Sequence, residues 1–464
     1  MSLFDTAPQW ANAARQTLQG AVRINRTLLK ISQVAARCLR KRRRPEPREL
    51  RKLFESLGTT YIKLGQFIAS SPTLFPEPYV EEFQLCLDRT PNVPFSTLAK
   101  LIESELSARI EQKFLRIDPR PLASASIAQV HAAVLLDGRE VVVKVQKPGV
   151  RETINTDLNT AFVVARLLEL VTPALSRSAI TDIIREIHQS MLDECDFRKE
   201  ARNLVLFNNF VLQHGIDDVF APAAIKSCSS GKVLTMERVH GRSLTSSEWR
   251  NPAEKHMVQR GLFNAMQAWL QSVTDCETFH ADLHSGNMLL QDDGRVAFID
   301  FGMVGRLEPR VWQAVLDLYA GIAAADLGKV AAAMIAVGMT RHKVYQPQLE
   351  QDLENVLRGM QQSGGAAFTP HGNGAAQRVE EKAERQLGAL MRVATRHGIR
   401  FPSAFTLLLK QLLYFDRYID LLAPGTDLFG SDALDASGLF SDARATFSKT
   451  ADGLAQPHLP PGLH

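Results

Sequence analysis

The sequence lacks the patterns that identify several large classes of protein. No run of about 18 apolar residues is free of charge, since the longest candidate, 312–340, contains three charged residues. We therefore expect no membrane-spanning helix. The five cysteines form no Cys-x-x-Cys pair and no metal-ligand spacing, which predicts buried or free thiols in a reducing compartment rather than a disulfide framework. A chain of 464 residues is long enough for two or three globular cores.

Basic residues are concentrated at the N-terminus. Residues 1–52 hold 13 Lys and Arg against 3 Asp and Glu, whereas the rest of the chain holds 41 against 47. Between Trp10 and Arg44, apolar residues recur every three or four positions with basic residues between them, which predicts an amphipathic helix. Such a helix could lie on an anionic membrane, present a solvated face, or act as an organelle transit segment. No aromatic residues alternate with the basic ones, so we expect no nucleic-acid binding.

A second helical pattern at 48–70 contains Lys63 and Gln66. These two residues lie one turn apart, so their side chains can project from the same face of a helix. Five prolines between residues 72 and 94 then predict a turn-rich connector. A further helix is expected at about 95–113.

The periodicity changes from helix to strand at 119–150. Two runs of β-branched residues are joined there by Asp137-Gly138, which is a hairpin signal. Lys144 ends the run VVVK, where kinases carry a lysine that pairs with phosphates. The preceding turn is rich in alanine, which is stiffer than glycine, so we expect it to hold a nucleotide differently from a glycine-rich loop. Its candidate nucleotide-binding residues are Ala123, Ser124, Ala125, Ser126 and Ala128.

Three acidic residues in the helical segment 153–212 are candidates to pair with Lys144, because any one of them can reach a strand lysine from a helix. They are Glu194, Asp196 and Glu200. Two strands are expected next, between residues 220 and 244. Met236 and Glu237 lie in the predicted hinge between two lobes, with their backbone available to an adenine.

The stretch 279–302 has the outline of a metal-nucleotide site. Asp282 is followed five residues on by Asn287 and then, after a turn and an apolar strand, by Asp300 in Asp-Phe-Gly. In kinase-like folds the first Asp faces the attacking hydroxyl, while the Asn and the second Asp hold Mg²⁺. The order and spacing therefore predict an Mg-ATP site that catalyses phosphoryl transfer.

The chain after this stretch favours a small acceptor. Position 281 is Ala where protein kinases carry the Arg that receives an activation-loop phosphate, and little chain separates Gly302 from the next helix. We therefore expect a small or lipid-like acceptor, or plain ATP hydrolysis. The remaining predicted elements are helices at 308–323, 326–337, 347–361, 377–397 and 401–422, a Gly-rich loop at 363–376 and a tail at 425–464.

With these residues assembled, the chain resembles the UbiB family of atypical kinase-like proteins, which includes the AarF and mitochondrial coenzyme Q kinase-like proteins. The resemblance covers about residues 48–425 and includes six motifs in the family's order. They are Lys63-Leu64-Gly65-Gln66, the Ala-rich ASASIAQVH at 123–131, Lys144 in VVVKVQKPGV, Glu194-Cys195-Asp196, Asp282 and Asn287 in HADLHSGN, and Asp300 in IDFGMVG.

The resemblance implies an α+β, two-lobed protein-kinase-like fold with an N-terminal helical extension and a largely helical C-lobe. It implies that Lys63 packs with Glu194 and Asp196 over the nucleotide site and restricts peptide entry, and that Glu200 pairs with Lys144. It also implies Mg-ATP binding, ATPase or small-molecule kinase activity, and a role in ubiquinone biosynthesis beside proteins of that pathway. Many bacterial members end in hydrophobic helices, whereas this chain ends in ADGLAQPHLPPGLH, so we expect a peripheral membrane protein of the cytoplasm or of mitochondria.

We divide the chain accordingly into a basic segment (1–47), a helical extension (48–118), an N-lobe (119–240), a C-lobe (241–425) and a tail (426–464). Two other interpretations are considered. One is a small-molecule phosphotransferase of the aminoglycoside or choline kinase type, which shares the Asp282–Asn287 spacing and a metal-binding Asp, but Lys63, Gln66 and the Ala-rich loop argue against it. The other is a nucleotide-gated scaffold for a membrane-associated assembly, which is compatible with every motif. A hydrolytic metal site built on His280, Asp282 and His284 would leave Asn287 and Asp300 without a role.

Overall fold

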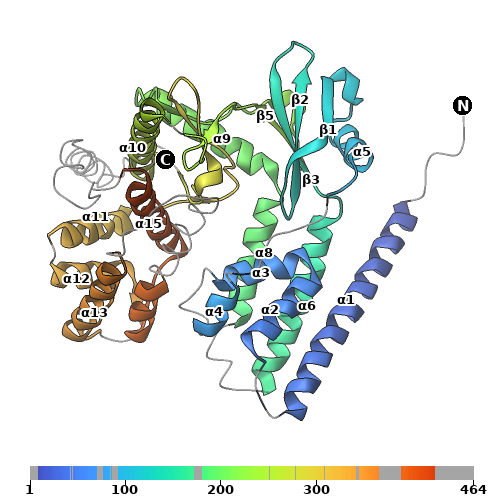
Figure 1. The fold of residues 1–464 in the computed structure, drawn as a ribbon. Coiled ribbons are helices and arrows are strands. Elements are labelled where there is room, and N and C mark those ends of the chain that lie inside the picture. The colour runs from blue at the N-terminus through green and yellow to red at the C-terminus, as the bar shows by residue number, and fades with distance from the viewer. Residues whose placement is uncertain are drawn as a thin grey trace, which may run out of the picture. The chain divides into compact units, whose positions relative to one another are not determined.

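The computed structural model describes most of the chain (Figure 1). The described residues are 9–41, 43, 45–69, 77–83, 85, 92–171, 180–249, 251–276, 278–307, 309–324, 326–340, 344–364 and 388–423. The chain divides into two compact units, Met1–Ala201 with Ala224–Arg238, and Arg202–Ala223 with Val239–His464. Each unit is described by itself.

The first unit begins with four helices, α1 (Gln9–Arg40), α2 (Pro47–Leu57), α3 (Thr59–Ala69) and α4 (Glu77–Phe83). The helical pattern predicted at 48–70 forms two helices, α2 and α3, because Gly58 adopts a φ of 101° between them. A helix cannot continue through a residue with positive φ, and glycine adopts that conformation at no steric cost. Buried Leu57 and Tyr61 on either side of this break pack with Ile31 of α1.

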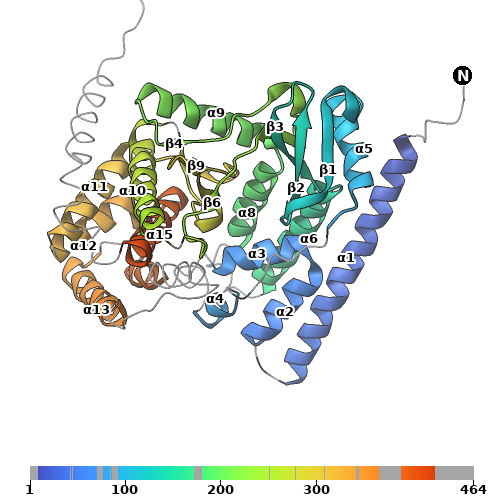
Figure 2. The ribbon, with the colours of Figure 1, turned by 45° about the horizontal axis from the view of Figure 1, so that its top comes forward.

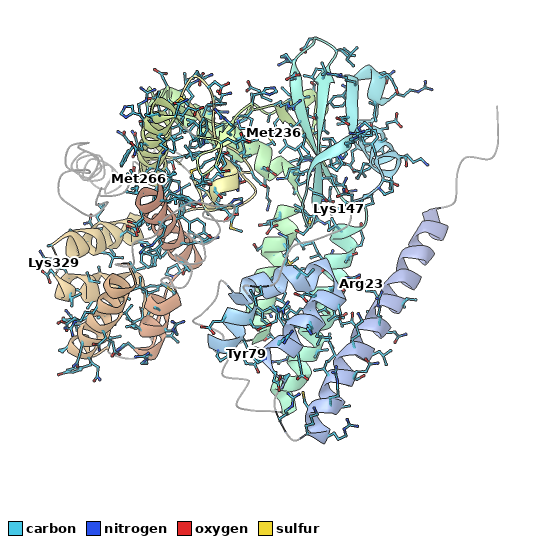
Figure 3. All side chains as sticks on the ribbon, in the orientation of Figure 1. Arg23, Tyr79, Lys147, Met236, Met266 and Lys329 are labelled. Atoms are coloured by element: carbon cyan, nitrogen blue, oxygen red, sulfur yellow. The ribbon has the colours of Figure 1, made fainter. Side chains whose placement is uncertain are left out.

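The predicted N-terminal helix is confirmed, and part of its surface is used for packing. Arg23 donates two hydrogen bonds, of 2.6 and 2.5 Å, to the buried carboxylate of Asp157 in α6 (Val150–Val171), and Figure 3 labels Arg23 on α1. Lys30 donates to the carbonyl of Ser56 over 2.6 Å. Arg23 and Lys30, two basic residues of α1, therefore form contacts within the protein.

An antiparallel sheet in the order β1-β2-β3-β5 follows these helices. Its strands are β1 (Phe114–Ser124), β2 (Ala128–Leu135), β3 (Glu140–Gln146) and β5 (Val233–Glu237). The Asp137-Gly138 hairpin is confirmed, with Gly138 at a φ of 87°. The helix expected at 95–113 is shorter than predicted, since α5 (Phe95–Leu106) ends where Ser107 turns to a φ of 50°.

Helix α5 covers one face of this sheet (Figure 2). Val141, Val143 and Val145 of β3 are buried in the core that includes Leu98 of α5. Successive side chains of a strand alternate between its faces, so Lys144 lies on the opposite face. The valines of the run VVVKV that alternate with Lys144 are thus buried in a core, while Lys144 lies on the other face of the same strand.

Two further helices follow α6 in the chain. They are α8 (Ile180–Glu194) and α9 (Phe197–Gln213), and α9 begins in the first unit and ends in the second. The predicted helical segment 153–212 therefore consists of three helices, α6, α8 and α9, as far as the structure describes it.

The second unit contains the long helix α10 (Pro252–Asp275) and, near it in the chain, two small sheets. One sheet has the order β4-β9-β8-β6, and the other pairs β7 with β10. The strands are β4 (Val219–Phe220), β6 (Arg242–Ser243), β7 (Phe279–His280), β8 (Met288–Leu290), β9 (Val296–Phe298) and β10 (Val304–Gly305). Helix α10 begins at a capping box in which Asn251 and Glu254 bond each other's backbone amides.

Helices dominate the rest of the second unit. They are α11 (Pro309–Ala323), α12 (Leu327–Val337), α13 (Gln346–Gly364) and α15 (Ser403–Leu422), with a short pair of strands β11 (Met339–Thr340) and β12 (Ile399–Arg400). Residues 388–396 are also helical, whereas residues 365–387 and the predicted tail lie outside the described residues. The α+β class is confirmed. In the part of the chain that the structure describes, no helix combines the length and apolarity needed to cross a membrane.

Candidate active site

The first group of predicted site residues surrounds Lys144. Its Nζ lies 2.8 Å and 3.0 Å from the two carboxylate oxygens of Glu200 in the first turn of α9. Both residues are buried, and the ring of Phe197 lies 5.6 Å from Nζ. Three acidic residues were candidates for this pair, and the structure contains the one that the family resemblance implied.

The start of α9 is fixed by backbone contacts that hold Glu200 in place. Asp196 accepts a hydrogen bond of 3.2 Å from the amide of Arg198, as an N-terminal helix cap does. The amide of Phe197 donates to Gly231, and the buried side chain of Gln146 donates to the carbonyl of Cys195 over 2.9 Å. Asp196 therefore orients the helix that carries Glu200.

Lys63 of α3 forms an ion pair with Glu194, the last residue of α8. This contact joins the Lys-x-Gly-Gln motif to the Glu-x-Asp motif within one unit. The side chain of the other predicted residue of the motif, Gln66, lies outside the described residues. Burial raises the pKa of the intervening thiol, Cys195, to about 11, so this cysteine stays protonated at neutral pH.

The Ala-rich segment forms the turn between β1 and β2. Its turn is closed by a hydrogen bond of 2.9 Å from the amide of Ala125 to the carbonyl of Ala128. Ala123 and Ala125 are exposed, whereas Ser126 and Ala128 are buried. No residue of this described turn has a positive φ, so its backbone does not need glycine.

Ser124 was a candidate for phosphate contact through its hydroxyl. The Oγ atom is buried and has no hydrogen-bond partner among the described residues. The side chain therefore points into the protein in this structure.

The predicted hinge residues lie at the end of β5. Met236, labelled in Figure 3, is buried, pairs with Val142 of β3 and forms a bridge with Ala224. Glu237 is exposed, and the next residue, Arg238, donates its amide to Glu140 over 3.2 Å.

In the second unit, Asp282 and Asn287 lie on one loop between β7 and β8. The side-chain amide of Asn287 donates to the backbone carbonyl of Asp282 over 2.9 Å, and Asn287 is buried. Within the described chain, no donor is bonded to its Oδ1. A buried amide oxygen held in this way fits the role of a ligand to Mg²⁺, which prefers oxygen donors.

Asp300 follows β9 in a strained backbone conformation. Its φ of 60° makes it one of two non-glycine residues with positive φ among those described. Its side chain is exposed, and the amide of Gly302 lies 3.4 Å from Oδ1. The amide of Ile299 donates to the carbonyl of Asn287 over 3.0 Å, which keeps the two predicted metal ligands on neighbouring segments. Strain of this kind is often found at functional positions.

His280 has a structural role. Its Nδ1 accepts a hydrogen bond of 3.2 Å from the amide of Asp282, and its Nε2 lies 3.0 Å from the carbonyl of Ile299. Burial lowers the pKa of His280, so the ring is neutral. Because both ring nitrogens are engaged, His280 cannot serve as a metal ligand, which argues against a hydrolytic site on His280, Asp282 and His284.

The sequence analysis missed two residues of α15. Lys410 Nζ lies 3.1 Å from Asp282 Oδ1, and Gln411 bonds the backbone of Leu283. Burial by itself would raise the pKa of Asp282, but Lys410 and His284 outweigh it, and this pKa lies below its usual value. One signal was available, since Lys410 is the only charged residue between Ser403 and Phe415.

Comparison with known proteins shows the family of this chain. The profile of the ABC1 atypical kinase-like domain matches residues 85–334, which is more than half of the chain. The chain belongs to this family. An uncharacterized chloroplastic aarF domain-containing protein kinase of Arabidopsis thaliana is 43% identical over 397 residues, covering 82% of this chain and 73% of the relative. A probable protein kinase UbiB of Azotobacter vinelandii is 35% identical over 59% of this chain and 52% of its own.

A solved structure of a Mycobacterium tuberculosis protein in complex with erythromycin shares 22% identity and a TM-score of 0.48, covering 79% of this chain and 98% of that one. The expected kinase-like α+β fold of this ABC1 protein is confirmed by the family match together with the observed elements. A kinase-like domain implies nucleotide binding.

Proposed function

We propose that this ABC1 protein binds Mg-ATP and either hydrolyses it or transfers its γ-phosphoryl group to a small or lipid-like acceptor. The observation that carries the proposal is the buried ion pair between Lys144 and Glu200. Active kinases need such a pair between a strand lysine and a helix glutamate, because it directs the lysine toward the phosphates.

Each remaining residue has a role in this chemistry. Asn287 Oδ1 and the Asp300 carboxylate are the proposed ligands of Mg²⁺, which when bound neutralises charge on the phosphate oxygens. Asp282 faces the attacking hydroxyl or water. Its low pKa keeps it a carboxylate, which can accept the hydrogen bond of that nucleophile. The backbone near Glu237 remains the proposed adenine contact.

The acceptor is proposed to be small. The ion pair between Lys63 and Glu194 ties α3 to the end of α8, next to the start of the helix that carries Glu200. Only a short segment separates Gly302 from α11, which begins at Pro309. Both features favour a small molecule over a folded peptide substrate. A role in ubiquinone biosynthesis, with proteins of that pathway as partners, rests on the UbiB resemblance alone.

The test of nucleotide binding uses Asp300→Asn. Wild-type protein is expected to gain thermal stability from ATP with Mg²⁺, because a ligand of the native state adds RT ln(1 + [L]/Kd) to its stability. The variant is expected to lose the Mg²⁺-dependent part of the gain, while Asp293→Asn in the exposed turn before β9 retains it. A folded Asp300→Asn protein with the full gain would overturn the metal assignment.

The test of the acceptor restriction uses Lys63→Ala. If the ion pair with Glu194 restricts access, its loss is expected to change Mg-ATP turnover or to unmask self-phosphorylation while the fold is retained. Intact-mass measurement after incubation with Mg-ATP detects the added phosphate. Wild-type turnover and an unchanged mass in this variant would refute the proposed role.

We also propose that the protein is peripherally bound to an anionic membrane through α1. The outward side chains of Val22 and Leu29 are 61% and 59% exposed, and Arg26 and Arg37 are exposed beside them. Basic residues near an anionic surface contribute about 1 kcal/mol each, and salt weakens that attraction. The location remains either cytoplasmic or mitochondrial in this proposal.

Substitution tests membrane binding better than truncation, because deleting α1 would also remove the contact between Arg23 and Asp157. Flotation of wild-type protein with anionic liposomes is expected to fall as salt rises. The variant Val22→Gln/Leu29→Gln/Arg26→Gln is expected to float less at every salt concentration. Equal flotation of both proteins would assign membrane binding to another surface.

A further inference from the structure

Helix α15 contacts the candidate catalytic loop through two consecutive side chains. Lys410 Nζ lies 3.1 Å from Asp282 Oδ1. Gln411 Oε1 accepts from the amide of Leu283 over 2.8 Å, and its Nε2 donates to the carbonyl of the same residue over 3.2 Å. A helix 128 residues away in the sequence thus holds two neighbouring residues of the loop.

The two contacts differ in kind. Gln411 and Leu283 are fully buried, and the glutamine amide satisfies both backbone groups of Leu283. Such a two-point contact fixes the distance between the helix and the loop. Consecutive residues of a helix point about 100° apart, so Lys410 projects in a different direction and reaches the carboxylate instead.

Only one oxygen of the Asp282 carboxylate, Oδ1, is bonded to Lys410. Lys410 engages Oδ1, whereas Oδ2 lies 4.0 Å from His284 Nε2, beyond hydrogen-bond distance. The Asp282 side chain is 29% exposed and that of Lys410 is 17% exposed, so the carboxylate is accessible from solvent. Oδ2 is therefore the oxygen that an attacking hydroxyl or water can meet.

We infer that Lys410 is a positioning residue, which holds Asp282 Oδ1 so that Oδ2 is presented to the nucleophile of phosphoryl transfer. This inference depends on the proposed Mg-ATP chemistry and adds to it a residue on α15. Gln411 holds α15 against Leu283, and this contact fixes how far Lys410 lies from Asp282. The ring of Tyr414, one turn later, lies 5.2 Å from the ammonium and limits its movement.

The test compares the kinetics of three substitutions at one position. Lys410→Met is expected to lower kcat for Mg-ATP turnover about 10- to 100-fold with KM for ATP unchanged, because a misdirected catalytic group costs rate rather than binding. Lys410→Arg, which can still hold Oδ1, is expected to recover most of that loss. Lys410→Gln serves as a second neutral variant if the methionine variant does not fold.

The matched control is Lys329→Met on α12, an exposed lysine labelled in Figure 3 that, among the described residues, pairs with its own helix cap, Asp326. It is expected to keep wild-type kcat. Thermal stabilisation by Mg-ATP is expected to be the same in all of these variants, which separates a positioning role from a binding role.

The outcomes distinguish this inference from the proposed function. Wild-type kcat in a folded Lys410→Met or Lys410→Gln protein would overturn the inference and leave the proposed function intact. A raised KM with unchanged kcat would overturn it as well, because it would make Lys410 a binding residue. Absence of Mg-ATP turnover in the wild-type protein would overturn the proposed function and, with it, this inference.

Discussion

Two lysine–carboxylate pairs, one in each unit, differ in their exposure to solvent. In the first unit, the side chains of Lys144 and Glu200 are 10% and 4% exposed. In the second, those of Lys410 and Asp282 are 17% and 29% exposed. A buried charge that loses its partner has no water to replace that partner, whereas a partly exposed charge is screened by solvent.

This difference in solvent exposure predicts different roles for the two ion pairs. Breaking the Lys144 pair is expected to be costly to the fold, so its effect on turnover cannot be separated easily from its effect on stability. Breaking the Lys410 pair costs little stability, so this lysine can be changed with the protein folded and its effect on turnover measured.

The largest effect is expected for Glu200→Ala. The substitution leaves the Lys144 ammonium buried without this carboxylate, and breaking such a pair typically costs about 3–5 kcal/mol of stability. Urea unfolding measures the loss. The control is the double variant Lys144→Met/Glu200→Leu, which removes both charges and is expected to be more stable than Glu200→Ala. A double variant that is equally unstable would show that packing, and not charge, holds this site.

A loss of comparable size is expected for Gln411→Leu, because two buried backbone groups lose their partner. The substitution leaves the amide and carbonyl of buried Leu283 without their partners, at a cost of about 1–3 kcal/mol for each unsatisfied group. The matched control is Gln313→Leu on α11, where the glutamine is exposed and pairs with Asp317 of the same helix. Similar unfolding free energies for the two variants would contradict the proposed anchoring of the loop.

The buried hydroxyl of Tyr61 predicts a pH effect on the packing of α1. Burial raises the pKa of Tyr61 to about 12 from its usual 10.0. Because the folded-state pKa is above the unfolded one, the stability from the protonated hydroxyl is present below pH 10 and is lost as pH rises to 12. The full loss is roughly 2–3 kcal/mol. Tyr61→Phe is expected to lack this part of the pH dependence between pH 9 and 12, and an identical pH profile would refute the assignment.

The smallest effect on stability is expected for Lys410→Met. Its ion pair with Asp282 is partly exposed, and the measured contribution of such pairs is about 0–1 kcal/mol. The same urea series measures it beside Glu200→Ala. A loss as large as that of Glu200→Ala would remove the distinction between the two pairs, and would require the turnover of Lys410 variants to be corrected for unfolding.

Features that depend on residues close together in the chain could be predicted from the amino-acid sequence. The Asp137-Gly138 hairpin follows from turn chemistry, and the position of Lys144 on β3 follows from the alternation of a strand. The order of Asp282, Asn287 and Asp300 identified the candidate site for the same reason, since the loop and hairpin that carry them are local.

Contacts between side chains that are distant in the sequence depend on how the chain packs, and the sequence pattern did not reveal them. The residue pattern by itself left three acidic candidates for Lys144, and the start of α9, capped by Asp196, turns Glu200 toward β3 as the family resemblance implied. The break at Gly58 depends on a backbone conformation that helical periodicity does not reveal. Lys410 lies 128 residues from Asp282 in the sequence. The pattern of the helix shows that it carries one lysine among apolar residues, but it does not predict which carboxylate that lysine contacts. Hydrophobic periodicity predicts which face of a helix or strand is buried. Which other element packs against that face depends on the tertiary arrangement.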